Sequence, residues 1–92
     1  MKVAQAEVLA VEALGWIGKN DELLMRFLGM TGADVGDLRT RAAEPEFLGF
    51  ILDFILSEDA MVVEFAEYGN RPPEEVIAAR AALPGGDVPF WT

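Results

Sequence analysis

Carboxylates are the side chains through which this chain could carry out acid–base or metal chemistry. Its 92 residues include 16 Asp and Glu but neither cysteine nor histidine. Without those two residue types there is no disulfide, no thiolate nucleophile, no histidine general base and no zinc site of the usual kind. Catalysis would therefore have to use carboxylates, either as general acids and bases or as ligands of a hard cation.

Asp53 has the most unusual surroundings of these carboxylates. It lies in the apolar run FILDFIL, where removal from water would raise the pKa of its carboxyl and make it a candidate general base. It also belongs to a narrow stripe of polar or small residues, at i, i+3, i+7 and i+11, that runs from Glu46 to Ser57. On that stripe Asp53 reaches water or pairs with an arginine such as Arg39 or Arg41. We favour this structural interpretation over the catalytic one.

Paired carboxylates occur at three expected helix starts, Asp21–Glu22, Glu58–Asp59 and Glu74–Glu75. The positive end of a helix dipole stabilises them there, which explains them without a site. Glu64 and Glu67 lie one turn apart and could share a cation, but a di-metal site in a helical bundle usually needs Glu-x-x-His pairs. We therefore predict that the protein is not an enzyme, with no catalytic residue, no metal and no cofactor. A carboxylate-based or metal-binding enzyme is the last of three functional hypotheses.

One apolar segment, residues 47–56 (FLGFILDFIL), is expected to organise the fold. Eight of its ten residues are large and apolar, which in a helix means burial on nearly every side. Ten helical residues rise only about 15 Å, about half the hydrocarbon thickness of a bilayer, so a membrane span is excluded. We predict an all-α fold, a compact orthogonal bundle of five to six short helices around this central apolar helix. Residues 1–86 form the single domain, and residues 87–92 form a C-terminal tail.

Helical periodicity and capping residues predict where the helices lie. The expected segments are residues 3–18; 21–31, between an Asn20 N-cap and Gly32; 35–43, capped by Asp34; 45–56, beginning at Pro45; 58–68, between a Ser57 cap and Gly69; and 74–83, after Pro72 and Pro73. The segment 35–43 is expected to bury Val35, Leu38 and Ala42. The segment 58–68 is expected to bury Met61, Val62, Phe65 and Tyr68, and the segment 74–83 is expected to bury Val76, Ile77 and Leu83.

The two halves of the chain share a layout at a spacing of 37 residues. The segment ALGWIGKNDELLMRFLGMTG aligns with FILDFILSEDAMVVEFAEYG, which places Asn20 on Ser57 and Gly32 on Gly69. Each half then has an apolar helix, a cap, a second helix and a glycine, as a duplicated unit would. Capped amphipathic helices also resemble one another without common descent, so both explanations stay open.

The charge balance argues against two classes of partner. A formal net charge of −9 opposes duplex nucleic acid, whose binding depends on cationic contacts to phosphate. It opposes anionic membrane surfaces for the same reason. The lack of cysteine suits a reducing compartment, and Glu7 and Glu12 interrupt what would be a signal-peptide core. We expect a cytoplasmic protein that binds neither nucleic acid nor membrane.

The segment LLMRFLGMTGADVGDLRTRAA has the outline of a helix-turn-helix, with Gly32 in the turn. Its second helix carries Asp34 and Asp37 where phosphates and base edges would lie, against Arg39 and Arg41 further along. A helix-turn-helix-like regulatory protein that acts through protein contacts more than DNA is therefore the second functional hypothesis.

Phe90 and Trp91, which follow PGGDVP, are the candidate partner-binding residues. Two aromatic side chains near a chain end either seal a groove of their own domain or anchor another chain. A hydrophobic content of 52% is high for 92 residues, so apolar surface can remain for a partner or a homodimer. The leading hypothesis is a small acidic, non-enzymatic interaction or adaptor module with an unknown protein partner.

A family resemblance covers residues 13–83. The stretch NDELLMRFLGMTGADVGDLRTRAAEPEFLGFILDFILSEDAMVVEFAEYGNRPPEEVIAARAAL resembles the short bacterial proteins of domain-of-unknown-function family thirty-five seventy-two. Its strongest parts are FLGMTGADVGDLR and the central helix followed by Ser57, Glu58 and Asp59. The resemblance implies an all-helical cytosolic protein of no established activity. That family has no assigned functional residues, so none is carried over to this sequence.

Overall fold

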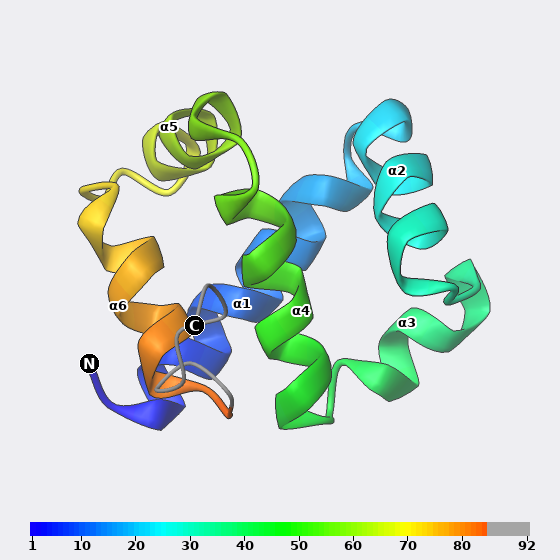
Figure 1. The fold of residues 1–92 in the computed structure, drawn as a ribbon, viewed down its shortest axis with the longest axis horizontal. Coiled ribbons are helices and arrows are strands. Elements are labelled where there is room, and N and C mark those ends of the chain that lie inside the picture. The colour runs from blue at the N-terminus through cyan, green and yellow to red at the C-terminus, as the bar shows by residue number, and fades with distance from the viewer. Residues whose placement is uncertain (85–92) are drawn as a thin grey trace, which may run out of the picture.

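The computed structural model describes residues 1–84, and within them the chain forms six α-helices and no strand (Figure 1). The helices are α1 (Val3–Gly18), α2 (Asp21–Thr31), α3 (Val35–Arg41), α4 (Pro45–Leu56), α5 (Asp59–Tyr68) and α6 (Glu74–Ala82). No helix in this described range is both long and apolar enough to cross a bilayer. The radius of gyration is 12.1 Å, close to the value for a compact chain of about 90 residues. The all-α bundle predicted from the sequence is confirmed.

Helix α4 lies at the centre of the bundle. Seven of its twelve residues are buried: Phe47, Leu48, Gly49, Ile51, Leu52, Phe54 and Ile55. Helices α1, α2, α5 and α6 all pack against it. In Figure 1, α4 crosses in front of α1, with α2 and α3 on one side and α5 and α6 on the other. The central position predicted for residues 47–56 is correct, because only enclosure on several sides keeps this many apolar groups from water.

Aromatic contacts fix the peripheral helices on this centre. The Phe27 ring meets the rings of Phe47 and Phe54 edge-to-face, with centroid distances of 5.8 and 5.4 Å. These contacts join α2 to α4. The ring centroids of Trp16 in α1 and Phe65 in α5 are 5.6 Å apart. Such pairs contribute about 0.5–1.5 kcal/mol each beyond the burial of their area, and their geometry restricts how the helices can slide.

Local sequence explains where α2 begins and ends and where α4 begins. The Asn20 side chain accepts a hydrogen bond from the backbone N–H of Leu23 at 3.1 Å, as an N-cap does. Gly32 ends α2 with a φ of 74°, a left-handed conformation that glycine adopts without strain. Pro45 lies in the first turn of α4, where no N–H is needed. These three predictions are confirmed.

Ser57 is not the N-cap of α5, contrary to the prediction. Its hydroxyl donates to the carbonyl oxygen of Phe54 at 2.6 Å, so Ser57 ends α4, and Glu58 occupies the N-cap position of α5. A serine hydroxyl can bond backward to a helix carbonyl or forward to an N–H. Spacing in the sequence does not distinguish the two directions.

Asp34 and Gly69 occupy the cap positions that the sequence predicts, but both differ from the expected cap geometry. Asp34 occupies the N-cap position of α3, but its side chain makes no capping hydrogen bond. Gly69 follows α5 with a φ of −90°, and the left-handed residue is Asn70. The left-handed Gly32 therefore has no counterpart at Gly69. At this point the structure does not repeat the 37-residue layout of the sequence.

Val35, Tyr68 and Ile77 are exposed, although the sequence pattern placed them inside. Helix α3 lies at the edge of the bundle and has no buried residue (Figure 1). Leu38 packs against the core, but Leu38 and Ala42 are only partly buried, because a helix of seven residues at the edge is covered on one side alone. In α6 the buried line runs from Val76 to Leu83 at intervals of three and four residues. Ile77 lies about 100° round the helix from that line.

Asn20→Ala should lower the free energy of unfolding by about 1 kcal/mol, because the N–H of Leu23 loses its side-chain acceptor. Ser57→Ala is the matched control. It should lose less than about 0.5 kcal/mol, because the carbonyl of Phe54 still accepts the backbone N–H of Ser57. Urea unfolding at an unchanged m value measures both. Equal losses would contradict the placement of the α5 cap at Glu58.

Candidate functional site

Helix α1 has apolar residues on its exposed side as well as on its buried side. Within α1 only Gln5, Glu7 and Glu12 have amide or carboxylate side chains. Its buried residues are Ala6, Leu9, Ala10, Ala13 and Ile17. The opposite side of a surface helix is normally polar. In α1 that side consists of Ala4, Val8, Val11, Gly15 and Gly18, a set we call the outer face of α1.

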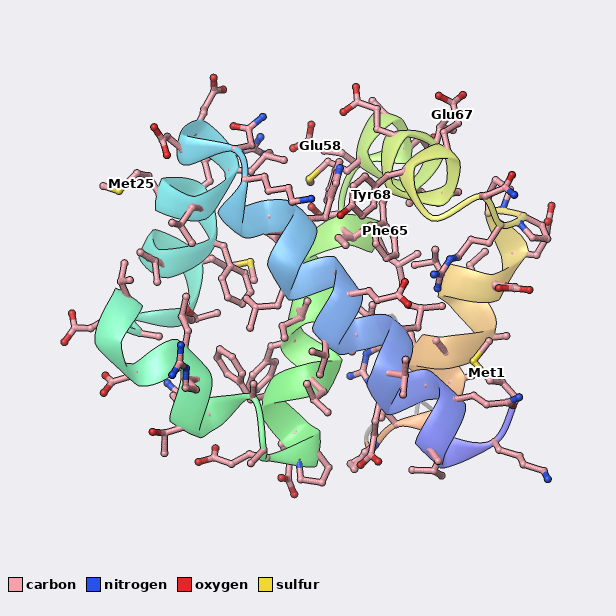
Figure 2. The ribbon with its side chains drawn as sticks, turned by 180° about the vertical axis from the view of Figure 1, so that it is seen from behind. Met1, Met25, Glu58, Phe65, Glu67 and Tyr68 are labelled. Carbon is pink, nitrogen blue, oxygen red and sulfur yellow. The ribbon has the colours of Figure 1, made fainter. Side chains whose placement is uncertain are left out.

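The outer face is open to solvent. Val8 is 61% exposed and Val11 is 49% exposed. A Cβ added at Gly15 or Gly18 would meet no atom within 4 Å. Figure 2 shows α1 running diagonally across the near side of the molecule, and no other helix of the described part of the chain lies in front of it. Apolar side chains that are exposed together, unlike those scattered singly, mark binding surfaces.

Gly15 lowers the stability of α1 without a visible benefit inside the molecule. Glycine within a helix is about 0.5–1 kcal/mol less favourable than alanine. Its φ is not positive, so the backbone conformation does not require glycine. No neighbouring atom requires the space either. A use that remains for glycine at this position is the close approach of another backbone.

The outer face borders a hollow of about 290 Å³ between α1 and the start of α6. The hollow is lined by Met1, Gln5, Val8, Leu9, Glu12, Arg71 and Glu75. Arg71 pairs with Glu12, and its guanidinium lies 5.4 Å from the centroid of the Phe65 ring. Gly69 makes room for it, since an added Cβ would lie 2.6 Å from Arg71 Nε. The cation of this lining is therefore already neutralised by a carboxylate of the same chain.

Tyr68 is exposed, and in Figure 2 it lies close to α1. Lys19, which follows α1, donates to the Tyr68 hydroxyl oxygen at 2.7 Å, and its Nζ lies 4.8 Å from the ring centroid. Burial of the ring would have taken this ammonium and hydroxyl out of water, which is costly. The apolar periodicity of α5 carries no signal of the lysine, which comes from another helix.

Asp53 pairs with an arginine, as predicted, but the partner is Arg80 of α6 and neither Arg39 nor Arg41. Nε and Nη2 of Arg80 donate to Oδ1 and Oδ2 of Asp53 at 2.6 and 3.2 Å. Nη1 of the same guanidinium donates to the carbonyl oxygen of Pro84 at 3.0 Å. The Arg80 side chain is 17% exposed and that of Asp53 is 42% exposed. This two-point ion pair joins α4 to α6.

Gly49 allows the guanidinium to lie against α4. An added Cβ at Gly49 would stand 3.0 Å from Nη1 and 3.1 Å from Cζ of Arg80. The stripe predicted along α4 is therefore partly covered by an arginine. No local pattern identifies this partner, because Arg80 is 27 residues away from Asp53 and helix packing decides which arginine is near.

The other carboxylates are dispersed. Within residues 1–84, no three of them gather closely enough to hold a metal ion. Glu64 and Glu67 are exposed on α5. The pairs Asp21–Glu22 and Glu74–Glu75 lie in the first turns of α2 and α6, and Asp59 lies in the first turn of α5, as the helix dipole predicts.

The second helix of the helix-turn-helix outline is α3. Its first turn carries Asp37 and its last turn carries Arg39 and Arg41. The Arg41 guanidinium lies 4.7 Å from the centroid of the Phe47 ring, and its Nε is 4.0 Å from a carboxylate oxygen of Glu44. One of the two basic side chains of this helix is thus held against its own domain.

The predicted partner-binding residues Phe90 and Trp91 lie outside the described residues, so their role stays a prediction. The described chain ends at Pro84. A second hollow, of about 490 Å³, lies there between the ends of α1, α4 and α6. It is lined by Val3, Glu7, Pro45, Ala81, Ala82, Leu83 and Pro84.

Comparison with known proteins places the chain in a family. The sequence model of the family described as "Protein of unknown function (DUF3572)" matches residues 3–86. The chain belongs to this family. The comparisons found no match among curated proteins or among solved structures. The DUF3572 match begins at residue 3, so it includes α1 and its outer face.

In this DUF3572 chain, Asp53→Asn should lower the free energy of unfolding by about 1–2 kcal/mol, because the largely buried Arg80 side chain loses its counter-charge. Glu58→Gln is the matched control. Glu58 pairs with Arg26 where both side chains are nearly half exposed, so the loss should stay below about 0.5 kcal/mol. Thermal and urea unfolding measure both variants. A loss at Asp53 no larger than at Glu58 would contradict its role in joining α4 to α6.

Proposed function

We propose that this protein is a non-enzymatic protein–protein interaction module and that the outer face of α1 is its binding surface. The observation that carries the proposal is that α1 is apolar on both sides while the bundle covers only one of them. Helices that are apolar all round are normally enclosed. A partner laid on the outer face would remove Val8 and Val11 from water, at a gain of about 25 cal/mol for each Å² of apolar surface buried.

The structural use of the carboxylates supports a role without catalysis. Asp53 pairs with Arg80, and Glu12 pairs with Arg71. In both cases the partners come from different parts of the chain, so the pairs fix how helices pack. Asp53 was the strongest candidate for a catalytic base, and its arginine partner accounts for it without a reaction.

The positions of the arginines support a partner other than nucleic acid. Arg26, Arg41, Arg71 and Arg80 each lie within 4.0 Å of a carboxylate of the same chain. Phosphate binding needs cations that are free to meet the phosphates, and the chain has a formal net charge of −9. A chain without cysteine also suits the reducing cytoplasm, which is the location we propose.

A photo-reactive amino acid at position 8, in the full chain expressed in its native cell, should form discrete covalent adducts with the partner. The matched positions are 22 and 64, which are exposed on α2 and α5 and carry glutamate. They should give no such adduct. Val11→Glu should lower the yield at position 8 by at least about fivefold, because a buried charge opposes docking. Mass spectrometry identifies the adducts.

If the photo-reactive amino acid formed the same adducts at positions 22 and 64 as at position 8, the binding would not be specific to α1, and the proposal would be contradicted. A chain that ends at residue 86 separates the outer face from the tail. Adducts at position 8 that persist without residues 87–92 assign the partner to α1. Loss of the adducts on truncation would instead make the tail, with Phe90 and Trp91, part of the binding surface.

A further inference from the structure

We infer that the occupant of the outer face is a second copy of this chain, with the two α1 helices packed antiparallel about a twofold axis. The inference rests on the proposed function, since it names the partner of the same surface. Two copies that meet through one surface require that surface to complement itself. The spacing, the side-chain sizes and the charges of α1 meet that requirement.

The outer face has the spacing of a coiled-coil seam. Ala4, Val8, Val11, Gly15 and Gly18 follow one another at intervals of four, three, four and three residues, the d-a-d-a-d order of a heptad pattern. In an antiparallel pair, each a position meets a d position of the other helix. Val8 therefore meets Val11 of the second copy, and Ala4 meets Gly15 of the second copy. The twofold axis passes between the two valine layers.

The side chains of the seam suit a close approach of two helices. Valine faces valine in the central layers, and alanine faces glycine in the layers beside them. The open space around Gly15 and Gly18 is room that a second helix can fill. In Figure 2 none of the helices within residues 1–84 stands in front of α1, so these helices leave the seam open to a second helix.

The charges beside the seam select the antiparallel orientation. Gln5 and Glu12 lie along one edge, at e positions, and Glu7 and Leu14 lie along the other, at g positions. Antiparallel packing brings like edges together, so Gln5 meets Glu12 of the second copy and Glu7 meets Leu14. Parallel packing would bring Glu7 against Glu12 of the second copy, and two like charges repel. The Gln5 amide can donate to a Glu12 carboxylate that also binds Arg71.

The area and the net charge indicate a weak dimer. Two helices of 16 residues that touch along one seam bury much less than the roughly 800 Å² per partner of a standard stable interface. Each copy also has a formal net charge of −9, so the copies repel at long range until salt screens them. We expect a dissociation constant of about 10–500 µM that falls when salt is added. A basic partner would show the opposite dependence on salt.

Sedimentation equilibrium of the full chain between about 5 µM and about 1 mM tests the inference. The mass should rise from 10.0 kDa towards twice that value. Gly15→Leu should raise the dissociation constant by at least about tenfold, because a bulky side chain separates the helices. Gly29→Leu is the matched control, since an added Cβ there is equally free of neighbours but lies on α2. It should change the constant by less than about twofold, and circular dichroism checks that both variants fold.

Introduced cysteines test the orientation, because the chain has none of its own. A mixture of Ala4→Cys and Gly15→Cys chains should form a disulfide between the two variants under mild oxidation. Either variant alone should not, because the two copies of residue 4 lie about 16 Å apart along an antiparallel pair. A disulfide in each variant alone, with no disulfide between the two variants in the mixture, would overturn the antiparallel arrangement.

A mass of 10.0 kDa at every concentration and salt level would overturn the inference. So would an equal weakening by Gly15→Leu and Gly29→Leu. If the chain stays monomeric while position 8 forms adducts with a different protein in cells, the proposed function stands and the second copy is wrong. If position 8 forms no adduct and the chain stays monomeric, both are wrong.

Discussion

The enclosure of α4 is the constraint on which the rest of the structure depends. Seven of its twelve residues are buried, and full burial of one large apolar side chain is worth about 1.5–3 kcal/mol. A single helix cap is worth only about 1 kcal/mol, so packing around α4 outweighs local preferences. Helices α1, α2, α5 and α6 each cover part of α4. Helix α3, which buries no residue, is left at the edge.

Arginine side chains connect parts of the bundle, and two of them, Arg26 and Arg71, combine contact with an aromatic ring and an ion pair. Arg26 lies 5.7 Å from the centroid of the Phe54 ring and pairs with Glu58. Arg71 lies in the same way near Phe65 and pairs with Glu12 of α1, and Arg80 joins α6 to α4. The planar guanidinium suits both an apolar surface and a carboxylate. Each of these three cations is paired with a carboxylate of the same chain, and the chain as a whole has a formal net charge of −9.

Helix α1 connects this architecture to the proposed function. Its inner side supplies small residues that let α4 and α6 lie close, and its outer side is apolar without being covered. The bundle therefore presents an apolar strip on a rigid helix, bordered by Glu7 and Glu12. A rigid surface loses little conformational freedom on binding, which favours recognition through so small a strip. Contacts of α1 with α2, α4 and α6 hold that strip in place.

The sequence alone determined the helical elements, because their signals lie within a few residues of one another. The Asn20 cap, the start of α4 and the central place of residues 47–56 follow from such local patterns. Sequence reasoning did not determine the direction of the Ser57 hydrogen bond or the partner of Asp53. It also missed the outer face of α1, although the valine and glycine spacing was visible. Tertiary structure decided these points, because burial and pairing depend on which helix lies against which, and Arg80 meets Asp53 only after α6 has packed on α4.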